Sequence, residues 1–351
     1  METIDLIKTP RALGYHFPAE WEPHRATWLS YPHDDSYSWP GTLPRIFPYY
    51  NRFILELSRN EEVCINVRSE ELKSKVTRDL EEMGVDMSRV SFFLHPTNDA
   101  WCRDHGPAFV VKPGSGVPKG IISWKYNAWG DKYPHDLDDE IPALIGKRFN
   151  IPVWFPGIVM EGGAVEFNGR GSLLTTTACL LHENRNPGLS RERIEEYLMN
   201  YYGVEKILWL EEGIDGDDTN GHIDDITRFF REDAVVTVVE PNRNDPNHAP
   251  LSANLKLLNS LRIQNGKQLD IAELPMPKPV IYEEQRLPAS YANFYIANRS
   301  VIVPNYRCRE DDIAMRVLQE CFPDREIIGI DSVEIIWGLG SFHCLSQQEP
   351  L

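Results

Sequence analysis

The chain has 351 residues, of which 42% are hydrophobic and 25% are charged, a balance typical of globular proteins that excludes a disordered chain. Its formal net charge of −17 repels nucleic acid and anionic lipid and attracts cations, so we expect no nucleic-acid or membrane partner. No run approaches the roughly 18 apolar residues of a membrane helix, and residues 1–17 lack the pattern of a secretory signal. We therefore expect a cytoplasmic protein with reduced cysteines, and these features are compatible with a homo-oligomer.

The first part of the chain predicts strands that alternate with helices. Strands are expected in ATWLSYP, EVCINV and VSFFL, and helices in RIFPYYNRFILELS and SEELKSKVTRDLEEM. A second unit follows, with strands in AFVVKPGSGVPKGIISW, a helix in HDLDDEIPALIGKRF and a strand in VWF.

Three later units repeat one order of hairpin, helix and strand. In the first of them the Asn168–Gly169 turn joins two strands, Ser190 is the predicted N-cap of RERIEEYLMNYY, Gly203 ends that helix, and KILWL is a strand. The order recurs in ITRFFREDAVVTVV, LSANLKLLNSL and QLDIAEL, and again in NFYIANRSVIVP, REDDIAMRVLQECF and EIIGID.

Units of mixed strand and helix bury their apolar faces against neighbours, which favours a closed ring. We therefore predict an α/β fold of five units in a single domain over residues 1–351. The Pro-rich stretch 275–280 is expected to be a surface loop.

A segment rich in Gly, Asp, Asn or Trp lies between the last strand of each unit and the next hairpin. The five segments are HPTNDAWCRDHGP, PGIVMEGG, EEGIDGDDTNGHIDD, RLPASYAN and SVEIIWGLGSFHC. Equivalent positions in a ring of five units face one axis, so we expect their reactive residues to converge on one pocket. These residues are Asp104, Glu161, His222, Asp224, Asn293 and Cys344.

Each candidate also has a purely structural interpretation. Taken alone, Asp104 could shape the turn at Gly106, Glu161 could be an exposed loop carboxylate, and Cys344 could be a small core residue. His222 and Asp224 share a face only if the backbone between them is extended, which the alternation in DITRFF favours.

A thiol, an imidazole and three carboxylates in one pocket suit a planar cation that sulfur attacks. Carboxylates bind a guanidinium through paired charged hydrogen bonds, an imidazole transfers protons, and a thiolate forms a covalent intermediate. The set lacks the Cys/His composition of a structural zinc site, the acidic loop at 215–218 lacks the EF-hand order, and no GxSxG elbow occurs. We expect no metal and no organic cofactor.

In combination, these motifs resemble the agmatine deiminase family of guanidine-modifying enzymes. The resemblance runs from EWEPHRATWLSYP through DAWCRDHGP, MEGG, LLHENRNPG, DGDDTNGHIDDITRF and ASYANFYIAN to GLGSFHCLSQQ. It implies a five-bladed pseudo-symmetric α/β propeller, the pentein fold, and hydrolysis of agmatine to N-carbamoylputrescine and ammonia through a covalent cysteine intermediate. The bacterial peptidylarginine deiminase branch is similar in the same motifs.

The resemblance also implies roles for five of the candidates. Cys344 matches the nucleophile of an HC motif, and His222 matches the general acid/base of TNGHID. Glu161 matches a carboxylate associated with the histidine and the substrate. Asp104 and Asp224 match the pair that holds the guanidinium nitrogens.

Two further residues and three departures concern the rest of the pocket. Trp101 matches a pocket-wall aromatic, and Asn293 matches a polar residue of the peptidylarginine branch. The chain reads WCRDHGP at 101–107 where the family reads WMRDTGP. It reads GLGSFHC at 338–344 where the family reads GGGNIHC. Plant-type members carry a longer insertion where this chain has only PMPKPVIYEEQR.

These departures leave open which group the substrate carries at the end away from the guanidinium. The alternatives are a deiminase of peptidyl or free arginine, with Arg103 or His105 receiving the carboxylate, an amidinotransferase, and a non-catalytic binding propeller.

Overall fold

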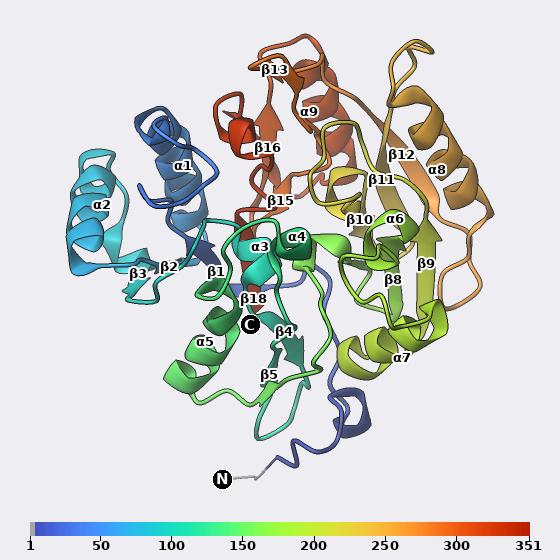
Figure 1. The fold of residues 1–351 in the computed structure, drawn as a ribbon, viewed down its shortest axis with the longest axis horizontal. Coiled ribbons are helices and arrows are strands. Elements are labelled where there is room, and N and C mark those ends of the chain that lie inside the picture. The colour runs from blue at the N-terminus through green and yellow to red at the C-terminus, as the bar shows by residue number, and fades with distance from the viewer. Residues whose placement is uncertain (1–3) are drawn as a thin grey trace.

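The computed structural model describes residues 4–351, in which small mixed sheets alternate with helices along the chain (Figure 1). In each three-stranded sheet the first two strands pair antiparallel, and the third pairs parallel with the second after a helical crossover. The longer helices lie around the outside of the molecule in Figure 1. This is the predicted order of hairpin, helix and strand, and the α/β class is confirmed.

Four such sheets follow one another along residues 4–351. Their strands are β4 (Ala108–Val111), β5 (Lys119–Ile122) and β6 (Val153–Trp154); β7 (Glu166–Phe167), β8 (Ser172–Thr176) and β9 (Lys206–Leu210); β10 (Thr227–Arg231), β11 (Ala234–Val239) and β12 (Asp270–Pro275); and β15 (Tyr295–Ile296), β16 (Ser300–Asn305) and β17 (Glu326–Asp331). The crossover helices are α5 (Ile141–Phe149), α7 (Arg191–Tyr202), α8 (His248–Ser260) and α9 (Glu310–Cys321). Short helical turns add α3 (Cys102–His105), α4 (Ala128–Asp131) and α6 (Thr177–Leu180).

Local signals in the sequence account for the unit around α7. Gly169 takes φ +66 in the turn between β7 and β8, and Oδ1 of Asn168 accepts hydrogen bonds from the backbone N–H groups of Arg170 and Ser172. Oγ of Ser190 accepts a hydrogen bond from the N–H of Arg193, so Ser190 is the N-cap of α7 as predicted.

One sheet joins the two ends of the chain. β1 (His24–Ser30), β2 (Glu62–Asn66) and β3 (Val90–Phe93) are parallel, with α1 (Leu43–Ser58) and α2 (Glu70–Glu82) as crossovers. β18 (Ser346–Pro350) pairs antiparallel with β1, and Figure 1 shows it at the centre of the molecule. The first unit therefore takes its hairpin partner from the C-terminal segment. The sequence did not predict this strand, because SQQEP is polar apart from Pro350 and its buried side chains carry no apolar alternation.

The Pro-rich stretch is only partly the surface loop that we expected. Pro275 is the last residue of β12, and Met276 is buried in the hydrophobic core. A small hairpin of β13 (Ile281–Tyr282) and β14 (Gln285–Arg286) follows, which the sequence did not predict.

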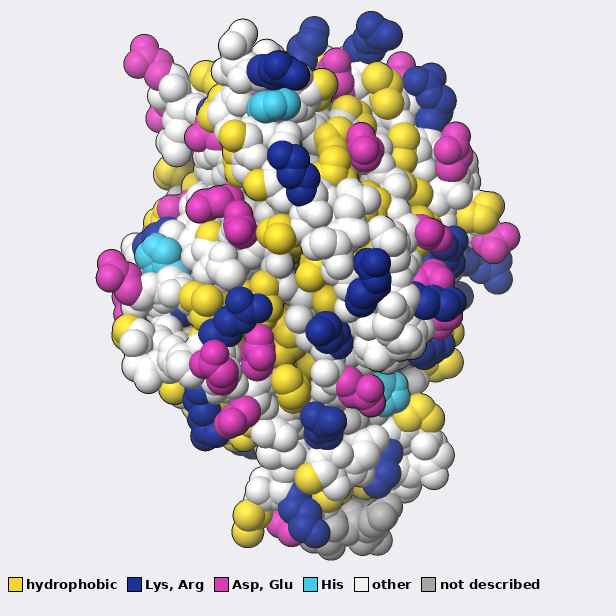
Figure 2. Space-filling view, turned by 90° about the vertical axis from the view of Figure 1, so that its right-hand side faces the viewer, with side chains coloured by type: hydrophobic (Ala, Val, Ile, Leu, Met, Phe, Trp, Pro, Cys, Tyr) yellow, Lys and Arg dark blue, Asp and Glu magenta, His cyan; other side chains and the backbone are white. Residues whose placement is uncertain are grey.

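Buried apolar side chains from the sheets and crossover helices form the core, in clusters that each span neighbouring units. Among the helices of residues 4–351, none has the length and apolar character that crossing a bilayer requires. On the face shown in Figure 2, Lys and Arg side chains are interspersed with Asp and Glu side chains.

Candidate active site

The predicted site residues lie on short turns that follow or precede the sheet strands. Asp104 belongs to α3, Glu161 precedes the 3-10 turn Gly162–Ala164, and His222 precedes the 3-10 turn Ile223–Asp225. All three side chains are buried. A Cβ on Gly163 would lie 2.5 Å from Nδ1 of His222 and 2.9 Å from Oδ1 of Asp104, so glycine at this position is what allows these segments to approach.

Three carboxylates surround the His222 ring. Nδ1 lies 3.8 Å from Oδ1 of Asp104 and 4.0 Å from Oδ1 of Asp224, while Nε2 lies 4.0 Å from Oε2 of Glu161. Within residues 4–351 neither ring nitrogen has a hydrogen-bond partner. Burial lowers the pKa of His222 to about 3, so the free protein holds a neutral imidazole.

The expected extended backbone between His222 and Asp224 is wrong. Residues 223–225 form a 3-10 turn, and β10 begins only at Thr227. His222 itself, at φ −57 and ψ 139, is the N-cap of that turn. The two side chains therefore meet because a turn folds back on its cap, and not because they share the face of a strand.

Cys344 meets two of the predicted residues. Nδ2 of Asn293 lies 3.0 Å from Sγ of Cys344, and Oδ2 of Asp224 lies 3.6 Å from it. Burial, followed by the charges of Asp224, Asp225 and Asp104, raises the pKa of the Cys344 thiol well above its usual value. At neutral pH the free protein thus holds a protonated thiol.

The carboxyl groups of Asp104 and Asp224 differ in their surroundings. Asp104 accepts hydrogen bonds from Nε1 of Trp129 and the N–H of Gly163, yet burial and then the charges of Asp224 and Glu161 raise its pKa well above the usual range. For Asp224 burial acts in the same direction, but the hydrogen bond and the charge of His343 outweigh it and the pKa lies below its usual value.

A pocket of about 150 Å³ reaches two members of this cluster, Cys344 and Asp104. Cys344 and the carboxylates of Asp104 and Asp218 line it, as do five aromatic rings, those of Tyr37, Trp101, Trp129, Tyr133 and Trp337. Leu339 also lines it, with φ +73, where the family reads glycine. No Lys or Arg among the described residues belongs to this lining. An aromatic slot with carboxylates suits a flat cation.

The two basic residues considered for a substrate carboxylate lie elsewhere. Arg103 and His105 line a separate cavity of about 30 Å³. Arg103 donates hydrogen bonds to Oε1 of Gln348 and to Oε2 of Glu20. Burial lowers the pKa of His105 to about 3, so this ring carries no charge at neutral pH.

Several buried residues that support the cluster carried no signal strong enough for us to predict them. Nε of Arg185 donates a 2.6 Å hydrogen bond to Oε1 of Glu161, and His343 links Asp224 to Glu20 at 2.6 and 2.8 Å. Arg185 lies in the motif LLHENRNPG and His343 in GLGSFHC, but only their place in the fold gives them these partners.

Comparison with known proteins places the chain in a family. The family model of the Porphyromonas-type peptidyl-arginine deiminase matches residues 16–350. The agmatine deiminase of Ectopseudomonas mendocina is 32% identical, over 98% of this chain and 98% of its own. The structure of the Enterococcus faecalis agmatine deiminase has a TM-score of 0.91 at 31% identity, covering 98% of both chains. A cysteine-to-serine variant of the C. jejuni agmatine deiminase with substrate bound has a TM-score of 0.86 at 33% identity, covering 95% of this chain and 96% of its own.

These matches confirm the resemblance that the motifs indicate, from the N-terminal EWEPHRATWLSYP to the C-terminal HC motif. With its model matched over residues 16–350 and relatives covered over nearly their whole length, this chain belongs to the Porphyromonas-type peptidyl-arginine deiminase family.

Proposed function

We propose that the protein hydrolyses agmatine to N-carbamoylputrescine and ammonia. The observation that carries this proposal is the pocket itself, in which Cys344 lies among carboxylates and aromatic rings with no Lys or Arg in the described lining. The relatives named agmatine deiminase support the same reaction class.

The guanidinium enters beside Asp104, Asp224 and Glu161, which accept its N–H groups. Trp101 is the aromatic wall against which the planar group packs. Entry of this charge lowers the free energy of the ionised carboxylate of Asp104 and of the Cys344 thiolate, both of which are unfavourable in the free protein. The thiol proton passes to His222 by way of Asp224, which lies 3.6 Å from Sγ and 4.0 Å from Nδ1.

The thiolate of Cys344 then attacks the central guanidinium carbon and forms a C–S bond. His222 returns the proton to the leaving nitrogen, and ammonia departs as the C–N bond breaks, which leaves a thiouronium. Neutral His222 next removes a proton from water. The hydroxide attacks the same carbon and the C–S bond breaks. The sulfur regains its proton from His222 by way of Asp224, and the proton of the new hydroxyl group leaves to ammonia or solvent as the carbonyl of the product forms. Asn293 donates a hydrogen bond to the sulfur throughout.

Arginine as the substrate is the second candidate, and the pocket disfavours it. Its carboxylate requires a basic partner, but Arg103 and His105 line the other cavity. Lys132 lies close to the pocket but pairs with Asp218 at 3.0 Å. Amidino transfer remains a rival that differs in what attacks the thiouronium. A binding protein without catalysis does not account for the burial of a thiol, an imidazole and three carboxylates in contact.

We also infer that the units close into a five-bladed propeller and act as one domain over residues 1–351. The supporting observation is the sheet in which β18 pairs with β1, because it joins the last unit of the chain to the first. A ring closed in this way brings one turn from each unit to a common axis.

The test is ammonia release from agmatine, free arginine and peptides with C-terminal arginine, measured side by side. The carboxylate of arginine would lie near the carboxylates of the pocket, and one such pair of like charges costs about 1–4 kcal/mol. We therefore expect kcat/KM for agmatine to exceed that for arginine by at least about tenfold. The Cys344→Ala variant, which lacks the proposed nucleophile, is the inactive control. Equal or better turnover of arginine would reject agmatine as the substrate.

A further inference from the structure

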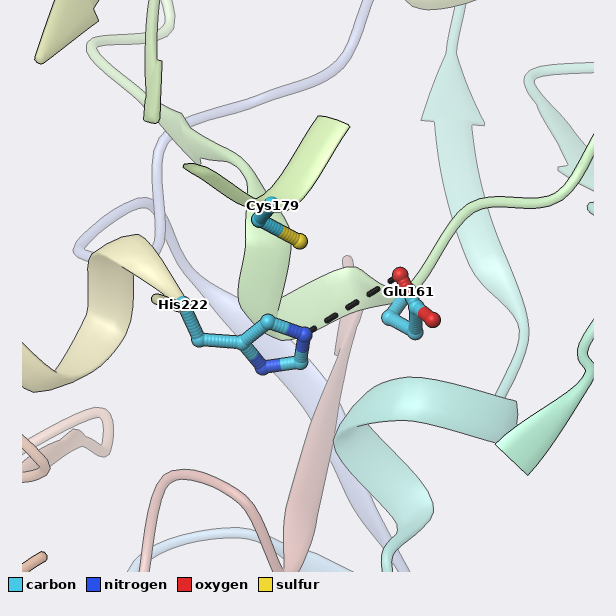
Figure 3. Close-up of side chains that lie close together, drawn as sticks. All are labelled: Glu161, Cys179 and His222. Carbon is cyan, nitrogen blue, oxygen red and sulfur yellow. Dashed lines mark ion pairs between the residues drawn. The ribbon is translucent and has the colours of Figure 1, made fainter. Parts of the chain in front are cut away.

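Cys179 lies beside the catalytic imidazole but takes no part in the proposed reaction. Figure 3 shows its sulfur and the His222 ring directed toward Glu161 from two different segments. Sγ of Cys179, a ring nitrogen of His222 and a carboxylate oxygen of Glu161 all lie within 4.8 Å of one another. All three side chains are completely buried. A thiol, an imidazole and a carboxylate are the ligand types that Zn²⁺ takes.

In the described part of the chain, two of these donor atoms are left for a ligand, which can be the substrate or a metal. Neither Oε2 of Glu161 nor Nε2 of His222 has a hydrogen-bond partner there. A buried polar atom without a partner costs free energy, so its retention calls for a ligand or a reaction. Nε2 faces Oε2 at 4.0 Å, on the side of the ring away from Asp104 and Asp224.

Hydrogen bonds to neighbouring residues hold Glu161 and Cys179 in place. Arg185 occupies Oε1 of Glu161 and leaves Oε2 free. Its other nitrogens donate to the side chains of Asn184 and Asn220 and to the carbonyl of Thr219, so the guanidinium stays in position without help from Oε2. On α6, Oγ1 of Thr176 accepts a hydrogen bond from the N–H of Cys179 and caps the turn.

Groups of both signs surround the three donors. The charges that act on the Cys179 thiol are those of Glu161, Arg185, Asp217 and Asp104, three carboxyl groups and one guanidinium. The other group of possible ligands, Asp224, Asp225 and Cys344, is less suited. It has no imidazole, and Oδ2 of Asp224 and Oδ1 of Asp225 already accept hydrogen bonds.

We propose that Glu161, Cys179 and His222 form an inhibitory site for a thiophilic divalent cation of the Zn²⁺ class. Sγ, Nε2 and Oε2 each form one bond to the metal, and Cys179 releases its proton to solvent. Three protein ligands leave the fourth tetrahedral position to water. The metal occupies the lone pair of Nε2 and the carboxylate beside it, so the imidazole no longer transfers protons. This inhibition rests on the proposed function, whereas the binding does not.

Binding is measured on the full chain as the Cys344→Ala variant, which removes the nucleophile and the alternative thiol ligand. Zn²⁺ is titrated in competition with a chromophoric chelator, and Co²⁺ serves as the spectroscopic probe. We expect one Zn²⁺ per chain and a thiolate-to-Co²⁺ charge-transfer band. Adding Cys179→Ser should weaken Zn²⁺ binding at least about tenfold and abolish the band, whereas the control Cys321→Ser should change neither.

Zinc X-ray absorption on the Cys344→Ala protein gives a readout that needs no change at Cys179. One sulfur ligand with nitrogen and oxygen ligands is expected, and a shell without sulfur overturns the site. In turnover assays Zn²⁺ should inhibit the unaltered enzyme, and Cys179→Ser should keep basal activity while needing at least about tenfold more Zn²⁺. Equal inhibition of that variant, or no Zn²⁺ bound by Cys344→Ala, refutes the proposal. Absence of deimination in every assay contradicts the proposed function and leaves the binding result intact.

Discussion

Nδ2 of Asn293 lies 3.0 Å from Sγ of Cys344. The same nitrogen donates a 2.9 Å hydrogen bond to Oδ1 of Asp225, and Oδ1 of Asn293 accepts a hydrogen bond from the N–H of Cys344. Asp225 therefore orients the amide so that its second N–H faces the sulfur. The amide offers the thiolate a hydrogen bond where most of the surrounding charge opposes ionisation.

We expect Asn293→Ala to lower kcat about 10- to 100-fold, because a hydrogen bond to a charged group contributes about 1.5–3 kcal/mol. Steady-state kinetics with agmatine measure this loss. The matched control is Asn265→Ala at an exposed position, which should retain normal kinetics. An unchanged kcat in Asn293→Ala would show that the amide does not support the sulfur.

Replacing the nucleophile should separate turnover from folding. Cys344→Ala removes one sulfur atom from a buried position, so the far-UV circular dichroism should stay as it is while product formation ceases. A haloacetamidine should leave a covalent adduct that mass spectrometry finds on Cys344. Label on Cys102, or normal activity of the alanine variant, contradicts the assignment.

The reactivity of Cys344 in the free protein should depend steeply on pH. Its pKa is raised, which means that deprotonation is disfavoured and the thiolate is the minor form at neutral pH. The rate of alkylation by iodoacetamide should rise about tenfold per pH unit from pH 7 to 9, because the thiolate is the reacting species. Mass spectrometry of the Cys344 peptide gives the rate, and a plateau below pH 8 is the opposite result.

Metal removal should leave the reaction intact. The proposed nucleophile is sulfur, and water is activated by an imidazole, so EDTA treatment of the enzyme should not lower kcat. Loss of activity with the chelator that only added Zn²⁺ restores would point to metal-activated water instead. Dialysis against metal-free buffer without EDTA is the control.

A buried arginine should be essential for stability rather than chemistry. Arg228 is fully buried, pairs with Glu166 at 2.8 Å and Glu20 at 2.9 Å, and donates to the carbonyls of Ala292 and Phe294. Arg228→Met leaves two buried carboxylates without their main cation, so the free energy of unfolding should fall by about 3–5 kcal/mol. Urea denaturation measures it.

The control for this change is Arg193→Met, which removes an exposed ion pair with Glu196. Solvent and salt screen such a pair, so its loss should hardly change the unfolding curve. Equal effects of the two substitutions would mean that burial does not decide the importance of Arg228.

Local signals in the sequence were sufficient for most individual elements. The Asn168–Gly169 turn, the Ser190 cap and the end of α7 at Gly203 depend on contacts within a few residues, and the structure has all three where they were predicted. Apolar periodicity likewise gave the strands that pair with their chain neighbours. Such features depend on backbone sterics and short-range hydrogen bonds, which each sequence segment carries with it.

The motifs also predicted which residues meet. Asp104, Glu161, His222, Asp224 and Cys344 were expected in one pocket because they fall at one phase of a repeated unit, and the distances place them within one cluster. The sequence did not predict how His222 approaches Asp224, since a 3-10 turn replaces the expected strand.

Other features arise only when distant segments pack together. β18 is a strand because β1 offers it backbone partners, and its own residues are polar apart from Pro350. The pairing of Arg185 with Glu161, the neutral state of His222 and the position of Arg103 away from the substrate pocket all depend on burial among segments far apart in the chain. The sequence by itself determined the residue types and their repeating order. Tertiary structure decided their protonation and their partners, because desolvation and charge act through space and not along the chain.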